Sequence, residues 1–102
     1  MKKIIKVLEQ LEFIPSESNT NNYKYYFLDI DQDNTINIVL GLEQDKKMVR
    51  ADLSKISLQT ELPIIAPANI SSEEMIKELL VSSLELQNHC PELVSKLNNL
   101  TL

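Results

Sequence analysis

The sequence predicts one α+β domain over residues 1–102, with elements in the order α-β-β-β-(β)-α-α and helices packed on one face of an antiparallel sheet of 3-4 strands. Two observations predict this class. Apolar residues recur at helical spacing near both ends of the chain, and they alternate with polar residues in the middle. A hydrophobic fraction of 43% and a charged fraction of 25% are typical of a soluble globular domain.

The first predicted element is an amphipathic helix over residues 2–13. Ile4, Leu8 and Leu11 share one stripe, and Pro15 is expected to end the helix. The polar segment 16–22 that follows is expected to be a mobile loop.

Three strands are predicted next, as an antiparallel meander over residues 23–30, 35–42 and 48–53. Polar turns at 31–34 and 43–47 separate them. Because side chains alternate across a strand, one face of the sheet should carry the aliphatic residues and point to the helices. The expected inward residues are Tyr26, Leu28, Ile30, Ile36, Ile38, Leu40, Leu42, Val49, Ala51 and Leu53.

Residues 55–60 are interpreted as a short fourth strand with Ile56 and Leu58 pointing inward. The apolar stretch 62–68 contains Pro63 and Pro67, and proline removes a donor from a strand ladder. This stretch is therefore expected to be an extended connection across one edge of the domain and not a central strand.

Ser71 and Glu74 form the pattern of a capping box, which predicts a helix running from Ser71 to about Asn88. Its apolar positions span about half of the helix circumference, enough for two packing neighbours. Pro91 is suited to the first turn of a last helix over 91–100, with Leu93, Leu97 and Leu100 buried. In topology alone this layout resembles the small chaperones of type III secretion and several toxin-immunity proteins.

The chain has one glycine, one histidine, one cysteine and no tryptophan, and this composition removes most kinds of chemical site. A phosphate-binding loop needs several glycines, and a nucleophile needs a base beside it. We expect no enzyme activity, no cofactor and no metal. His89 and Cys90 are interpreted as a helix cap and a small buried residue. The run of Asp and Asn over 29–34 is interpreted as a hairpin turn, because a calcium loop would need a bidentate glutamate at the position of Leu40.

Charge and hydropathy limit the partners. The net charge is −5, and the only basic cluster, Lys2, Lys3 and Lys6, is interpreted as the solvated face of the first helix, so direct nucleic-acid binding is not expected. No apolar run is long enough for a membrane span. A single cysteine cannot form an internal disulfide, so we expect a cytoplasmic protein, and the Lys, Asn and Ile content indicates a bacterial or phage source.

The candidate site is the sheet face opposite the helices. The same alternation that points the aliphatic residues inward collects residue types enriched in protein interfaces on this face. They are Tyr23, Tyr25, Phe27, Val39, Met48 and Arg50, with Asn37 beside them. The leading hypothesis is a non-catalytic module that binds another protein stoichiometrically, as an inhibitor, immunity protein or chaperone-like adaptor.

Three alternatives stay open at this point. The aromatic side chains on this solvated sheet face could simply stabilise the sheet through cross-strand pairs. The same face, or the broad apolar face of the helix after Ser71, could pair two copies of the chain as a homodimer. The third alternative is a small-molecule binder, or an enzyme with an unrecognised carboxylate site, which would require a pocket with convergent polar groups.

Overall fold

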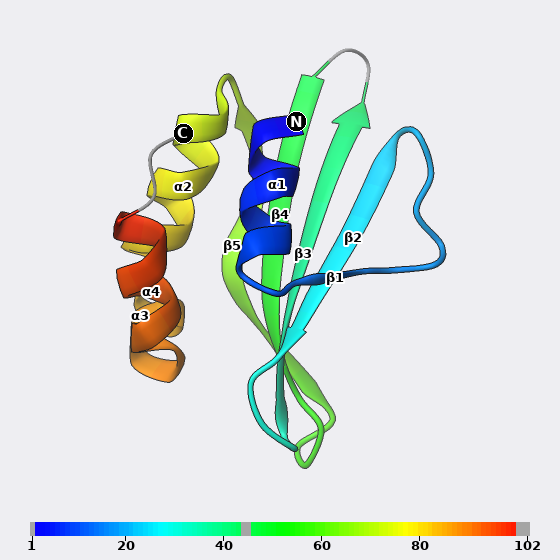
Figure 1. The fold of residues 1–102 in the computed structure, drawn as a ribbon. Coiled ribbons are helices and arrows are strands. Elements are labelled where there is room, and N and C mark those ends of the chain that lie inside the picture. Colours follow the sequence, from blue (N-terminus) through cyan, green and yellow to red (C-terminus); the bar gives the residue numbers. More distant parts are fainter. Residues whose placement is uncertain (1, 44–45, 100–102) are drawn as a thin grey trace.

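Five antiparallel strands form one sheet whose order, β1-β2-β3-β4-β5, is the order of the chain (Figure 1). The computed structural model describes residues 2–43 and 46–99. The strands are β1 (Ile14–Pro15), β2 (Tyr23–Asp29), β3 (Asn34–Glu43), β4 (Lys46–Lys55) and β5 (Thr60–Ile70), and the helices are α1 (Lys2–Gln10), α2 (Glu73–Ser82), α3 (Leu84–His89) and α4 (Pro91–Asn98). The predicted α+β class is confirmed, although the sheet has five strands and not 3-4.

The core lies between the helices and one face of the sheet. Tyr26, Ile38, Ala51 and Ile65 are register partners across β2 to β5, and all four are buried. Buried side chains of the four described helices belong to the same cluster. In Figure 1, α1 lies in front of the sheet and runs roughly along β4, while α2, α3 and α4 group on the β5 side. Among the side chains that the structure describes, the predicted inward face is confirmed, except that Ile30 lies beyond the end of β2 and is exposed.

A hydrogen bond between distant parts of the chain joins the first and second helices. The Glu73 carboxylate in the first turn of α2 accepts the backbone N–H of Ile4. The first backbone N–H groups of a helix have no partner within the helix, so an acidic side chain there is stabilising. This contact fixes the start of α1 against α2.

The first helix ends three residues earlier than predicted. Its end is a Schellman motif, in which the Phe13 N–H donates to the Leu8 carbonyl at 2.9 Å and the Glu12 N–H donates to the Glu9 carbonyl at 3.0 Å. Glu12 takes the left-handed conformation, with φ 70°. The turn itself therefore ends α1, and Pro15 instead belongs to β1.

Replacing Glu12 with glycine is expected to raise the free energy of unfolding by about 0.5–1 kcal/mol, because glycine adopts positive φ without a Cβ clash. Urea unfolding followed by circular dichroism would measure the change. Lys6→Gly is the matched control, since Lys6 is an exposed residue inside α1. There glycine should lower the free energy of unfolding by about 1 kcal/mol. Equal destabilisation by both variants would contradict the Schellman cap.

The segment predicted as a mobile loop is bonded along the edge of β2. The Tyr25 N–H donates to Asn19 Oδ1 at 2.7 Å, and the Tyr25 carbonyl accepts the Ser16 N–H at 2.9 Å. The Tyr23 carbonyl accepts the Thr20 N–H at 2.9 Å. Together with the two residues of β1, this segment pairs the edge groups that β2 would otherwise expose.

The prediction of a short strand over 55–60 is wrong. Strand β4 continues to Lys55, and residues 56–59 form a turn in which Ile56 is 64% exposed and Leu58 is 67% exposed. A residue of another turn, Asp33, holds this turn in place. Asp33 accepts the Ser57 N–H at 2.6 Å and the Ser57 hydroxyl at 2.8 Å, so the chain turns where its alternation suggests that it continues.

The stretch 62–68 is part of β5 and not a connection outside the sheet. It pairs with β4 through two register shifts, one between Val49 and Ala51 and one between Ala51 and Asp52. These irregularities accommodate the residues around Pro63 and Pro67, which cannot donate to a ladder. The prediction that this stretch is not a central strand is confirmed, because β5 is the edge of the sheet.

The single helix predicted over 71–88 is two helices. Ser72, and not Ser71, caps α2, accepting the Met75 N–H. Ser83 then ends α2, and its hydroxyl accepts the Leu86 N–H at 3.3 Å as the N-cap of α3. The break turns Leu84 out of the apolar stripe, so that its side chain is 72% exposed.

Three predictions concern residues outside the described part of the chain. They are the inward position of the Leu42 side chain, the burial of Leu100 and the centre of the turn predicted over 43–47.

Candidate functional site

The six predicted interface residues all lie on the sheet face turned away from the helices, which is called the outer face below. Register partners in an antiparallel sheet point their side chains to the same side. Tyr25 is the partner of Val39, and Val39 is the partner of Arg50. Tyr23 and Met48 are both partners of Gly41.

Five of these six residues line one shallow hollow of about 210 Å³. We call it the aromatic hollow, and its principal lining residues are Tyr23, Tyr25, Val39, Met48, Arg50 and Pro67. Phe27 does not line it and instead lies opposite Asn37 and Ile14. Sequence reasoning missed Pro67, because it placed that residue outside the sheet. It also missed Ile14, which extends the apolar outer face and is half exposed.

Gly41, the only glycine of the chain, gives the aromatic hollow its shape. A Cβ built at Gly41 would lie 3.1 Å from Tyr23 Cε1 and 3.2 Å from Tyr23 Cδ1. Such distances are shorter than ordinary carbon contacts, so the Tyr23 ring occupies the space that a side chain at Gly41 would take. Glycine in a strand often marks such a close approach.

Arg50 provides the positive charge at the aromatic hollow. Its Nε lies 3.5 Å from Asp52 Oδ2, and its side chain is 52% exposed. The Asp52 side chain is less accessible, at 18% exposed, so the pair is only partly solvated. A guanidinium has five N–H donors, so Arg50 can meet an incoming carboxylate while it keeps Asp52.

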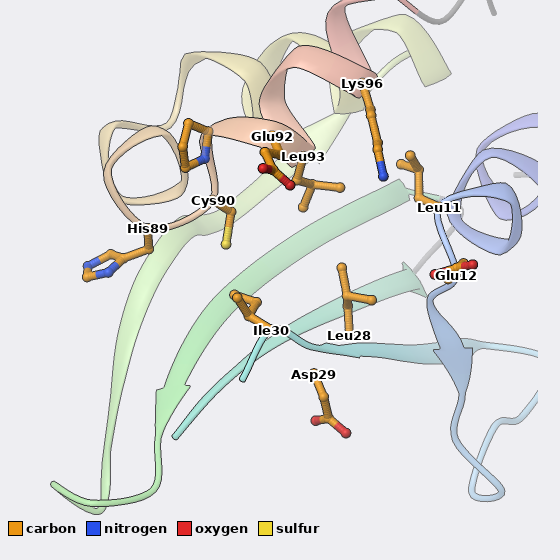
Figure 2. Close-up of a pocket in the computed structure, with 11 residues that line it drawn as sticks. Leu11, Glu12, Leu28, Asp29, Ile30, His89, Cys90, Glu92, Leu93 and Lys96 are labelled. Atoms are coloured by element: carbon orange, nitrogen blue, oxygen red, sulfur yellow. The ribbon is translucent and has the colours of Figure 1, made fainter. Parts of the chain in front are cut away.

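A second concave site lies where the end of α1, the end of β2 and the start of α4 meet (Figure 2). We call it the helix-end pocket. It has a volume of about 380 Å³, and Cys90 and His89 are among its lining residues. Figure 2 shows the Cys90 sulfur pointing into the pocket and the His89 ring pointing away from it.

Cys90 and His89 do not form a nucleophile and base. His89 Nε2 lies 3.4 Å from Glu85 Oε2, one helical turn earlier. Burial raises the pKa of the Cys90 thiol, and the negative charge of Asp31 raises it further. A thiol that stays protonated is a weak nucleophile.

Two carboxylates of the β2–β3 turn, Asp31 and Asp33, accept hydrogen bonds that stabilise this turn and the β4–β5 turn. Asp31 accepts the backbone N–H groups of Asp33 and Asn34, each at 2.8 Å, and the Asn34 amide. The pKa of Asp31 is lowered, mainly by the Asn34 side chain, and the pKa of Asp33 is lowered by the backbone N–H and hydroxyl of Ser57. The predicted hairpin turn is confirmed. Within residues 2–43 and 46–99, no group of three or more His, Cys, Asp or Glu is placed to hold a metal ion.

Comparison with known proteins finds no relative of this chain. No family model matches the chain, and no curated protein and no solved structure is significantly similar to it. In the described part of the chain, no helix is both long and apolar enough to span a membrane.

Proposed function

We propose that this chain is a non-catalytic module that binds another protein stoichiometrically through the outer face of its sheet. One observation supports this proposal above the others. Five residues chosen from strand alternation line a single hollow on a face turned away from the helices. Tyr, Met and Arg are enriched in protein interfaces, and side chains that carry binding energy cluster in such concave places.

The aromatic hollow favours a partner segment with an apolar side chain followed or preceded by a carboxylate. Tyr23, Tyr25 and Met48 offer apolar contact area to the first, and Arg50 offers a two-pronged donor to the second. A volume of about 210 Å³ suits one side chain and not a whole helix.

The closed edges of the sheet favour binding by its face over binding by strand addition. Segment 16–22 and β1 occupy the edge of β2. On the opposite edge, β5 contains Pro63 and Pro67, and proline in an edge strand disfavours pairing with a further strand. An added strand would find few continuous partners on either side.

The proposal includes a biological role and a cellular location. The chain would occupy its partner as an inhibitor, immunity protein or chaperone-like adaptor does, in the cytoplasm, where its single cysteine needs no partner. A homodimer through the outer face is the alternative. Sedimentation equilibrium decides between them, because a monomer at high concentration excludes the homodimer.

Changing Tyr25 to serine is expected to weaken binding to the partner about tenfold, or roughly 1.4 kcal/mol. Tyr25 is 38% exposed on the outer face, so its removal leaves the core intact. The tagged protein would first identify a partner by affinity capture and mass spectrometry, and calorimetry with the purified partner would then give the affinity.

Leu84→Ser is the matched control, because Leu84 is an exposed apolar residue on the helical side. It should leave the affinity unchanged. A partner that binds Tyr25→Ser as tightly as the natural chain, or that is lost with Leu84→Ser, would remove the outer face as the binding surface.

A further inference from the structure

The helix-end pocket has an apolar floor contributed by three separate elements. Leu11 comes from the turn after α1, Leu28 comes from the end of β2, Ile30 follows that strand, and Leu93 comes from α4. Leu28 is half-buried and packs against the core, whereas Ile30 is exposed. The volume of about 380 Å³ lies at the small end of ligand pockets, which span roughly 300–1,000 Å³.

Charges of both signs surround this floor. Figure 2 shows the amino end of Lys96 pointing between Leu93 and Leu11 toward Leu28, and the Glu92 carboxylate lying beside Leu93. Glu12 lies on the α1 side of the pocket. In the part of the chain that the structure describes, no ion pair joins Lys96 to Glu12 or Glu92. Asp29 points away from the apolar floor.

These charges select the chemistry of a ligand. A simple fatty acid would gain Lys96 but would meet two carboxylates of like charge, and a simple amine would gain the carboxylates but would meet Lys96. A zwitterion with an apolar side chain offers a partner of opposite charge to Lys96 and to one of the two glutamates, and it adds no net charge. Its carboxylate faces Lys96, its ammonium faces Glu92 or Glu12, and its side chain covers Leu28, Ile30 and Leu93.

We propose that the helix-end pocket binds a free α-amino acid with an aliphatic or thioether side chain, such as leucine or methionine. The proposal is independent of the outer face, because the helix-end pocket and the aromatic hollow share no lining residue. It assigns to the chain a small-molecule site in addition to a protein-binding surface.

Titration of the ¹⁵N-labelled chain with L-leucine and L-methionine tests the proposal. We expect shifts of the amides of residues 28–30 and 90–96, with a dissociation constant in the roughly millimolar range for so small a ligand. Leucinamide lacks the carboxylate and N-acetyl-leucine lacks the ammonium, so each should bind about tenfold more weakly. Absence of shifts at about 20 mM leucine, or equal binding of leucinamide, would overturn the proposal.

A pair of lysine variants separates specific binding from a general effect on the fold. Lys96→Met should weaken leucine binding about tenfold, whereas Lys6→Met, an exposed lysine on α1, should not change it. Normal leucine binding by Lys96→Met would contradict the assignment.

Discussion

Replacing Leu80 with alanine is expected to lower the free energy of unfolding by about 3 kcal/mol, whereas the same replacement at Leu84 should change it by less than about 0.5 kcal/mol. The two leucines lie four residues apart, the spacing at which residues share a helix face. In the structure their environments differ. Leu80 is 1% exposed and packs in the core, whereas Leu84 is 72% exposed.

The cause of this difference is Ser83. Its hydroxyl caps α3, and its backbone N–H donates to the Leu80 carbonyl at 3.3 Å, so the helix direction changes between the two leucines. Urea unfolding of both variants, followed by circular dichroism, would measure the two losses. Similar large losses at both positions would indicate one continuous helix with both leucines in the core.

Gly41→Val is expected to weaken binding through the aromatic hollow by about a hundredfold, or roughly 2.7 kcal/mol. The new Cβ would lie 3.1 Å from Tyr23 Cε1, so the Tyr23 ring has to shift, and the valine methyl groups would fill part of the hollow. Stability should change by less than about 1 kcal/mol, because valine favours strands and the Tyr23 side chain is only half-buried.

Thr35→Val is the matched control for Gly41→Val. Thr35 lies on the same strand and the same outer face, but it is not a lining residue of the aromatic hollow. Near-ultraviolet circular dichroism should report a changed tyrosine environment for Gly41→Val alone, and calorimetry with the partner should show a loss of affinity for that variant alone. Normal affinity of Gly41→Val would show that the hollow is not the contact.

Strand alternation predicted most of the sheet, and it failed where a distant side chain intervenes. Residues 35–41 and 48–53 alternate because one face is buried, and the structure follows that pattern. Residues 55–60 alternate equally well, but Asp33 binds Ser57 and forms a turn there. Local periodicity carries no information about a hydrogen bond to a residue 24 positions away.

The helical region shows the same limit. Apolar spacing over 71–88 predicts one helix, and nothing in that spacing distinguishes Ser83 from an ordinary helical serine. Its role as a cap depends on α3 packing against α4 and β5, which is a tertiary effect.

The candidate site was predictable in composition but not in shape. Period two alone places Tyr23, Tyr25, Val39, Met48 and Arg50 on one face, and the registers confirm this placement. The aromatic hollow also needs Gly41 beneath Tyr23, and Pro67 brought in by an irregular β5. Both depend on cross-strand registers that single-strand reasoning does not supply.

The chain-order sheet has a consequence for how the protein folds. Each strand of β1 to β5 pairs with its neighbour in the chain, so each pairing closes a short loop and costs little entropy. Topologies dominated by such local contacts fold faster than sandwiches with distant pairings. The exception is α1. The Ile4 N–H donates to the Glu73 carboxylate, and these two residues are 69 positions apart, with all five strands between them in the sequence. We therefore expect the hairpins to form early and the docking of the first helix to be a late event in folding.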